Sequence, residues 1–98
     1  MNIKSGRLVV ATAGTRVPFS ATSQRVERII IDAETDNTGV VVVGDVTVVA
    51  TLLSRIGTPL SATGDVEMTR IELFDVNLKD LYLDALVSTD GVTYTYFF

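Results

Sequence analysis

The stretch Glu34-Thr35-Asp36-Asn37-Thr38-Gly39, followed by Val40-Val41-Val42-Val43-Gly44-Asp45, decides the fold. A polar turn that ends in glycine is followed directly by four valines, and a second glycine closes the run. Because β-branched side chains favour the extended conformation over the helix, 40–43 is predicted to be a strand. Apolar side chains lie on both of its faces, so the strand must be central in a sheet or covered on both sides. The segment predicts an all-β protein.

The rest of the chain repeats this pattern of short apolar runs separated by turn residues. The expected strands are 7–13, 16–20, 24–34, 40–43, 45–51, 65–74, 81–87 and 92–98, with a less regular segment at 52–58. Pro18 restricts the second of them to a sheet edge or a strand end. About eight antiparallel strands with regular turns predict a β-sandwich or a jelly-roll-like barrel.

The length of 98 residues predicts one domain. We expect residues 1–6 to form an N-terminal arm and residues 7–98 to form the β-sandwich domain. A domain of this size buries a smaller fraction of its surface than a large one, so oligomerisation would add stability.

Three local features refine the expected topology. A tight turn at Gly44-Asp45 would pair the valine strand back onto 45–51. A phase shift in the alternation at Thr69-Arg70 predicts a β-bulge. In 78–87 a turn at 77–80 followed by a strand is favoured over a helix, and Asp90-Gly91 then predicts a hairpin between 81–87 and 92–98.

Two segments of the chain resemble each other, Pro18-Phe19-Ser20-Ala21-Thr22 and Pro59-Leu60-Ser61-Ala62-Thr63. Each precedes a long predicted strand. The match is either a coincidence of composition or a pair of similar turns that introduce strands in a pseudo-symmetric sandwich.

Composition and charge argue against several classes of function. The net charge of −4 does not suit phosphate binding, so we expect no nucleic-acid partner. No cysteine or histidine is present, which excludes disulfides, catalytic triads built on histidine, and metal sites built on either residue. The glycines of 39–44 are not followed by lysine or a helix, so they form no phosphate loop. We expect no enzyme activity, no cofactor, no metal, no signal peptide and no membrane span.

Carboxylates are the one remaining candidate for chemistry. Asp32, Glu34 and Asp36 are two residues apart and would share one face of an extended segment. A second group comprises Asp75, Asp80, Asp84 and Asp90. A calcium site or a glycosidase-type acid pair would use such residues, but a solvated strand face and turn-forming aspartates are the favoured interpretation.

The chain ends in aromatic residues, Tyr94, Tyr96, Phe97 and Phe98. They could form a sugar-binding platform or an intersubunit contact, because aromatic residues are enriched at interfaces. Core packing is the favoured interpretation for Tyr94 and Tyr96. Phe98 at the terminus is harder to bury within a monomer.

Several stretches resemble a family of small all-β virion proteins of tailed phages, the capsid decoration (cement) type. The similar stretches are Thr38-Gly39-Val40-Val41-Val42-Val43-Gly44-Asp45, Gly57-Thr58-Pro59-Leu60, Gly64-Asp65-Val66, Leu78-Lys79-Asp80-Leu81-Tyr82-Leu83-Asp84-Ala85 and Asp90-Gly91-Val92-Thr93-Tyr94-Thr95-Tyr96-Phe97. Val42 stands where the family pattern has a tyrosine. The resemblance spans roughly residues 24–98 and rests on turns and strands rather than on chemical groups.

The resemblance implies a structural protein that binds and stabilises a phage capsid shell without catalysis. It implies the major capsid protein as a partner, self-association as a homo-oligomer (a trimer), and location in the virion capsid, with host cytoplasm during assembly. The residues expected at the interfaces are Ile3, Lys4, Arg7, Tyr94, Tyr96 and Phe98. A tail or head–tail connector component and a carbohydrate-binding β-module remain as alternatives.

Overall fold

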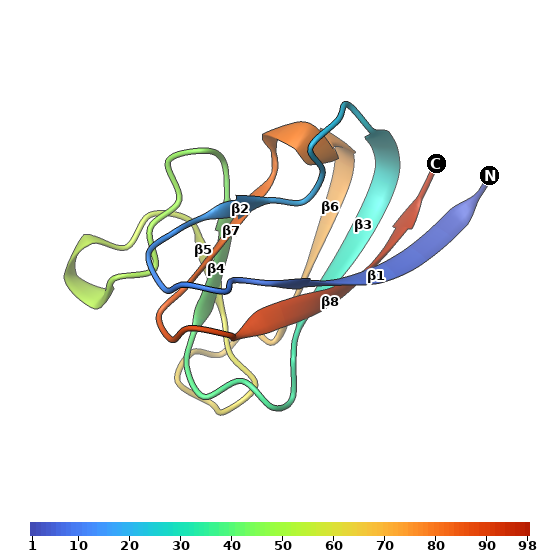
Figure 1. The fold of residues 1–98 in the computed structure, drawn as a ribbon. Helices are drawn as coiled ribbons and strands as arrows, with labels where there is room; N and C mark the ends of the chain where they lie inside the picture. The colour runs from blue at the N-terminus through green and yellow to red at the C-terminus, as the bar shows by residue number, and fades with distance from the viewer.

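A computed structural model describes all residues from 1 to 98 as two four-stranded antiparallel sheets packed face to face (Figure 1). The elements are β1 (Ile3–Val9), β2 (Val17–Pro18), β3 (Arg25–Ala33), β4 (Val41–Gly44), η1 (Leu52–Ser54), β5 (Thr58–Leu60), β6 (Arg70–Asn77), η2 (Leu78–Asp80), β7 (Tyr82–Ala85) and β8 (Gly91–Phe97). Sheet A has the order β1-β8-β3-β6 and sheet B has the order β2-β7-β4-β5. The prediction of an all-β, eight-stranded sandwich is confirmed.

The valine run occupies the position that its composition requires. Strand β4 is central in sheet B, between β7 and β5. Val41 and Val43 belong to the main core between the sheets, whereas Val40 and Val42 belong to a second apolar cluster. The second cluster is completed by Val48 and Ala50, which cover the outer face of sheet B. Both faces of the run are therefore buried, and burial of each valine contributes about 1.5–3 kcal/mol.

The main core lies between the two sheets. Ile29 and Ile31 of β3 are fully buried and lie opposite Tyr96 and Tyr94 of β8. The other residues of this core are Val10, Phe19, Val26, Ala33, Val41, Val43, Leu60, Leu78, Leu81, Leu83 and Ala85. The isoleucine triplet of β3 thus supplies two inward side chains, and Ile30 between them faces the opposite side of the sheet.

Strand β1 begins earlier than the sequence predicts. Residues 3–6, expected to be part of an arm, pair with β8 in register, from Ile3 opposite Phe97 to Gly6 opposite Tyr94. The strand ends at Val9 rather than at residue 13. The start was missed because Lys4, Ser5 and Gly6 carry no apolar alternation, whereas their pairing depends on the backbone of β8. Both chain termini lie at the free end of this two-stranded ribbon (Figure 1).

The predicted hairpin of 81–87 with 92–98 is wrong. Strand β7 pairs with β2 and β4 in sheet B, whereas β8 pairs with β1 and β3 in sheet A. The Asp90-Gly91 dipeptide lies where the chain crosses from sheet B to sheet A, and both residues contact residues that are distant in the sequence. The Asp90 carboxylate accepts hydrogen bonds from the backbone N–H groups of Thr38 and Gly39.

Segment 45–51 is not a strand but part of the long loop that connects β4 to β5, here named the β4–β5 loop (residues 45–57). Its one bridge joins Val49 to Ile56 within the loop itself. The predicted strand at 65–74 starts only at Arg70 and runs to Asn77, and no bulge lies at Thr69-Arg70. The local irregularity is instead at Asp75, which has a left-handed φ of 53°.

The predicted turn at 77–80 is confirmed as η2. The Asn77 side-chain oxygen accepts hydrogen bonds from the backbone N–H groups of Lys79 and Gln24, each at 3.1 Å. It caps the turn and also ties it to the start of β3. Strand β6 therefore ends at Asn77, whose side chain caps the turn that follows.

The two similar segments form similar turns at the two edge strands of sheet B. In the first, the Thr22 N–H donates to Ser20 Oγ at 3.2 Å; in the second, the Thr63 N–H donates to Ser61 Oγ at 3.1 Å. They follow β2 and β5 and lead to β3 and β6, which pair with each other. The interpretation as equivalent turns in a pseudo-symmetric sandwich is favoured over coincidence.

Candidate interaction surfaces

One face of sheet A is uncovered, because sheet B packs against the opposite face. Its residues form rows across the four strands, and we name it the outer face of sheet A. It comprises Ile3, Ser5 and Arg7 of β1, Thr93, Thr95 and Phe97 of β8, Arg28, Ile30 and Asp32 of β3, and Arg70, Glu72 and Phe74 of β6.

The first row of this face runs Ile3, Phe97, Arg28, Phe74. The Arg28 guanidinium lies 5.6 Å from the ring centre of Phe97 and 6.0 Å from that of Phe74, so it is flanked by two aromatic rings. It also forms an ion pair with Glu72. Ile3 and Phe74 at the ends of the row are 65% and 63% exposed. The row combines aromatic, aliphatic and arginine side chains without a covering element.

All four salt bridges of the chain lie on or beside this face. Besides Arg28–Glu72, they are Arg7–Glu34, Arg25–Asp75 and Arg70–Asp32. Hydrogen bonding to Asp32 raises the pKa of Arg70, with the charge of Asp32 adding to the effect. Apart from Arg7–Glu34, whose carboxylate is nearly buried, these pairs are exposed or half-exposed and contribute little to stability. Their consequence is a surface of paired charges around the row.

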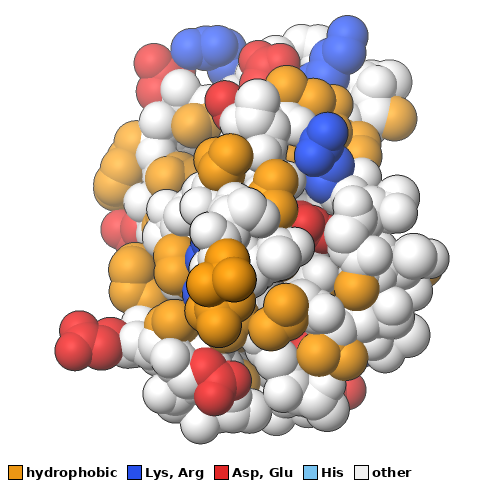
Figure 2. All heavy atoms as spheres, turned by 90° about the vertical axis from the view of Figure 1, so that its left-hand side faces the viewer, with side chains coloured by type: hydrophobic (Ala, Val, Ile, Leu, Met, Phe, Trp, Pro, Cys, Tyr) orange, Lys and Arg blue, Asp and Glu red, His pale blue; other side chains and the backbone are white.

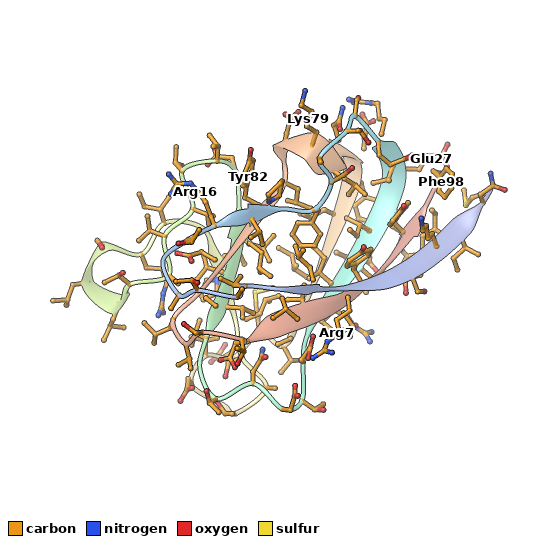
Figure 3. The ribbon with its side chains drawn as sticks, in the orientation of Figure 1. Arg7, Arg16, Glu27, Lys79, Tyr82 and Phe98 are labelled. Atoms are coloured by element: carbon orange, nitrogen blue, oxygen red, sulfur yellow. The ribbon has the colours of Figure 1, made fainter.

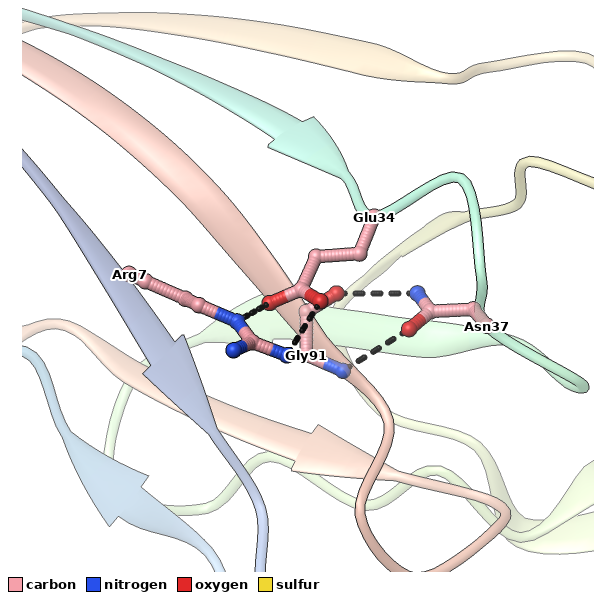
Figure 4. A network of polar contacts seen from close by, with 4 residues as sticks. All are labelled: Arg7, Glu34, Asn37 and Gly91. Carbon is pink, nitrogen blue, oxygen red and sulfur yellow. Dashed lines mark hydrogen bonds and ion pairs between the residues drawn. The ribbon is translucent and has the colours of Figure 1, made fainter.

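A network of polar contacts joins β1, the end of β3 and the start of β8 (Figure 4). The Arg7 guanidinium donates to both oxygens of Glu34, at 2.5 and 2.9 Å. This hydrogen bonding, together with the charge of Glu34, raises the pKa of Arg7. Glu34 is only 8% exposed, so the arginine neutralises a nearly buried carboxylate.

Next to this ion pair, the Asn37 side chain pairs with the backbone of Gly91 as a neighbouring strand would. Its amide donates to the Gly91 carbonyl at 2.8 Å, and its oxygen accepts from the Gly91 N–H at 2.9 Å. A Cβ atom at Gly91 would lie 2.3 Å from the Leu8 carbonyl oxygen, so only glycine permits this approach. The polar turn that precedes the valine run is thus fixed to β8.

The carboxylates that were candidates for chemistry are taken up by structural contacts. Asp32 pairs with Arg70 and Glu34 with Arg7. With Asp36, they border a depression that is also lined by Arg7, Ala62 and Thr93. No group of three acidic, histidine or cysteine side chains is positioned to hold a metal ion. Asp90 is buried and accepts backbone hydrogen bonds from a turn. Asp84 differs from the favoured interpretation, because it is neither solvated nor in a turn: it is buried within β7 and accepts hydrogen bonds from the backbone N–H groups of Gly14 and Ala50.

A second surface lies on the opposite side of the molecule, where the β4–β5 loop projects from sheet B (Figure 1). Leu52 and Leu53 of η1 are 70% and 97% exposed at its tip. Seen from this side, hydrophobic side chains gather on the surface (Figure 2). The loop is held by the buried Asp84 carboxylate, which accepts from the Ala50 N–H at 3.0 Å, and by Arg55, which donates to the Ala50 carbonyl.

The six residues predicted at interfaces lie on the β1–β8 ribbon but on both of its faces. Ile3 and Arg7 are on the outer face of sheet A, and Arg7 lies beside β8 (Figure 3). The other four share the inner side of the ribbon: Lys4, Tyr94, Tyr96 and Phe98. The ring centres of the three aromatic residues are 6.0 and 5.4 Å apart along the strand.

Their exposure differs sharply along this inner side. Tyr96 is 7% exposed and belongs to the main core, so its side chain is not available to a partner. Tyr94 packs edge-on against Phe19. Phe98 at the end of the ribbon remains partly exposed (Figure 3). The interface prediction is therefore corrected for Tyr96, and core packing is confirmed for it.

Four exposed or half-exposed residues of these surfaces were not predicted from the sequence: Arg28, Phe74, Leu52 and Leu53. A period-two reading of 70–77 places Phe74 with Arg70 and Glu72 on the polar face, and an aromatic residue there is a signal of an exposed contact. Two adjacent leucines inside an irregular segment give a similar signal for the loop.

Comparison of the chain with family models, with curated proteins and with solved structures finds no match in any of the three. In the structure, no helix is long and apolar enough to span a membrane. The residues on the two surfaces are therefore the basis of any functional assignment.

Proposed function

We propose that the chain is a structural virion protein of a tailed phage, which binds the assembled capsid shell and stabilises it without catalysis. The sequence resemblance suggests this role. The observation that carries a binding role is the exposed row Ile3, Phe97, Arg28, Phe74 on the outer face of sheet A. Aromatic residues and arginine are the types enriched in the cores of protein interfaces.

The physical mechanism of such a role is mass action. A protein that binds the assembled shell and not its separated subunits lowers the free energy of the assembled state. Many copies turn a modest contact energy into a large total stabilisation. The proposal includes the major capsid protein as the partner, a homo-oligomer, and location in the capsid after assembly in the host cytoplasm.

The outer face of sheet A offers a direct test. Phe74→Ser removes an aromatic side chain that is 63% exposed, so the fold is retained and only the surface changes. We expect its affinity for expanded capsids of the source phage to fall about tenfold or more, because burying a phenylalanine contributes about 1.5–3 kcal/mol. Binding is measured by cosedimentation with purified capsids.

Leu53→Ser is the matched control, because it also removes one exposed apolar side chain but on the opposite side of the molecule. It should bind as the wild type does. If Leu53→Ser loses affinity and Phe74→Ser does not, the assignment of the outer face is wrong. If the wild-type protein binds no capsid at any ratio, the decoration role is wrong.

The alternatives make different predictions. A tail or connector component would share this surface and differ by a low copy number per virion. A carbohydrate-binding module would need an exposed aromatic platform, but Tyr96 is buried and Tyr94 packs against Phe19. With Tyr96 buried and Tyr94 only partly exposed, the aromatic residues of the inner side do not form a continuous exposed platform, and this argues against a sugar-binding site there.

A further inference from the structure

The sandwich has four strand edges, and three of them carry features that oppose pairing with another chain. Strand β2 has two residues and contains Pro18, and β5 has three residues and contains Pro59. Strand β6 is interrupted by Asp75 in a left-handed conformation. Short edges, proline and local irregularity are the devices by which proteins block edge-to-edge association.

Strand β1 lacks these features. It is an edge strand of seven residues without proline, and β8 is the only strand that it pairs with. The backbone N–H and C=O groups of its even-numbered residues point toward β8. Asn2 and Phe98 exchange two backbone hydrogen bonds, and the Val10 N–H donates to the Asp90 carbonyl. Because hydrogen-bonding direction alternates along an antiparallel strand, the N–H and C=O groups of Ile3, Ser5, Arg7 and Val9 point away from the sheet.

We propose that β1 is a self-association edge, which pairs antiparallel with β1 of a second copy about a two-fold axis at Gly6. Gly6 is the midpoint of the strand. With the axis there, Ile3 lies opposite Val9 of the second copy, and Ser5 lies opposite Arg7 of the second copy. Both pairs join residues whose backbone N–H and C=O groups point away from β8. Every free backbone group of the strand therefore gains a hydrogen-bonding partner.

The side chains of β1 are compatible with this register. On the outer face, Arg7 meets serine and Ile3 meets valine. On the inner face, the single charge of Lys4 lies opposite Leu8 of the second copy. No two like charges face each other directly, which is the arrangement that would oppose strand pairing. Registers centred on Ser5 or Arg7 instead leave part of the edge unpaired.

The environment of Gly6 supports an axis at that position. The Tyr94 hydroxyl lies over Gly6, only 2.5 Å from where a Cβ atom would be. Glycine on both strands lets two backbones approach at the axis and brings the two Tyr94 hydroxyls toward each other. The result is one continuous eight-stranded sheet across both copies, with the two outer faces of sheet A on the same side.

This contact produces a dimer, and so it departs from the trimer that the family resemblance implies. It does not depend on the virion role, because it rests on the backbone geometry of β1 alone. A partner strand from another protein would use the same edge, and the experiment below separates that case from self-association.

The test combines sedimentation of the full chain over a wide concentration series with residue-resolved hydrogen exchange. We expect a shift from the 10.6 kDa monomer to twice that mass as concentration rises. In the monomer, the amides of Ser5 and Arg7 exchange quickly while those of Lys4 and Gly6 are protected. In the dimer, all four are protected. A monomer at every concentration, or association that leaves Ser5 and Arg7 unprotected, would overturn the proposal.

Ser5→Pro removes an outward N–H without breaking a hydrogen bond to β8, and Ser5→Ala is its matched control because both lose the hydroxyl contact with Thr95. The proline variant should weaken dimerisation at least about tenfold, since two symmetric hydrogen bonds are lost, and the alanine variant should not. Ser5→Lys keeps the backbone and places a like charge opposite Arg7, so it should also weaken the dimer. Equal dimerisation of all three variants would refute the self-association edge.

Discussion

The connection between the two sheets depends on one buried carboxylate, and its removal gives the sharpest test of the fold. Asp90 is 4% exposed, and its carboxylate accepts the Gly39 N–H at 2.8 Å and the Thr38 N–H at 3.1 Å. Asp90→Ala leaves both donors without this partner directly before the valine strand. Each hydrogen bond to a charged group contributes about 1.5–3 kcal/mol, so the two together contribute about 3–6 kcal/mol.

We expect a net loss of about 3 kcal/mol in the free energy of unfolding, at the lower end of that sum, because alanine also relieves the desolvation of the carboxylate. Urea denaturation followed by far-ultraviolet circular dichroism measures it. Asp36→Ala is the control: this aspartate lies exposed on the same turn, and its loss should change stability by less than about 0.5 kcal/mol. If Asp90→Ala costs no more than Asp36→Ala, the carboxylate does not hold the turn and the reasoning fails.

Two further predictions concern β8. Gly91→Ala should destabilise the protein by about 3 kcal/mol or more, because its Cβ would lie 2.3 Å from the backbone oxygen of Leu8; Gly64→Ala, with open space around it and a φ of +89°, should cost only about 1 kcal/mol in the same urea denaturation. Equal losses would contradict the close approach. Burial raises the pKa of Tyr94 above its ordinary 10.0. As the pH rises, the unfolded chain therefore loses the Tyr94 proton before the folded protein does. The folded protein is fully stable below the unfolded-state pKa of about 10, and it loses stability as the pH rises from there through the higher folded-state pKa. Tyr94→Phe should reduce this alkaline loss in thermal unfolding at low protein concentration, and an unchanged pH profile would show that the Tyr94 hydroxyl is not its source.

Local composition was sufficient to predict two central strands, one in each sheet. The valine run required a central strand, and β4 is central. The isoleucine triplet predicted 24–34, and β3 spans Arg25–Ala33. In both cases β-branched side chains determine the conformation and burial follows from their number.

The partners of these strands could not be predicted in the same way. Asp90-Gly91 has the sequence of a hairpin turn, yet its aspartate binds a turn about fifty residues away, and its glycine permits close contact with β1. Both residues serve contacts between distant segments, for which short-range turn preferences carry no information. The loop 45–51 has strand-like alternation for a related reason: Val48 and Ala50 cover the outer face of sheet B.

The candidate surfaces were predicted only in part. The interface predicted from the sequence lies on the β1–β8 ribbon, which includes Ile3 and Arg7 of the outer face of sheet A. Arg28 and Phe74 were not predicted, because strands β3 and β6 join that face only through tertiary pairing. A row of side chains that spans four strands cannot be recognised from the sequence of any one of them.

The proposed role as a capsid-binding structural protein is tested most directly by the copy number of this chain in purified virions. Quantitative mass spectrometry against the major capsid protein gives that number. The proposed role predicts an abundance comparable to that of the major capsid protein. A few copies per particle would indicate a tail or connector component instead, and absence from the particle would contradict the structural role altogether.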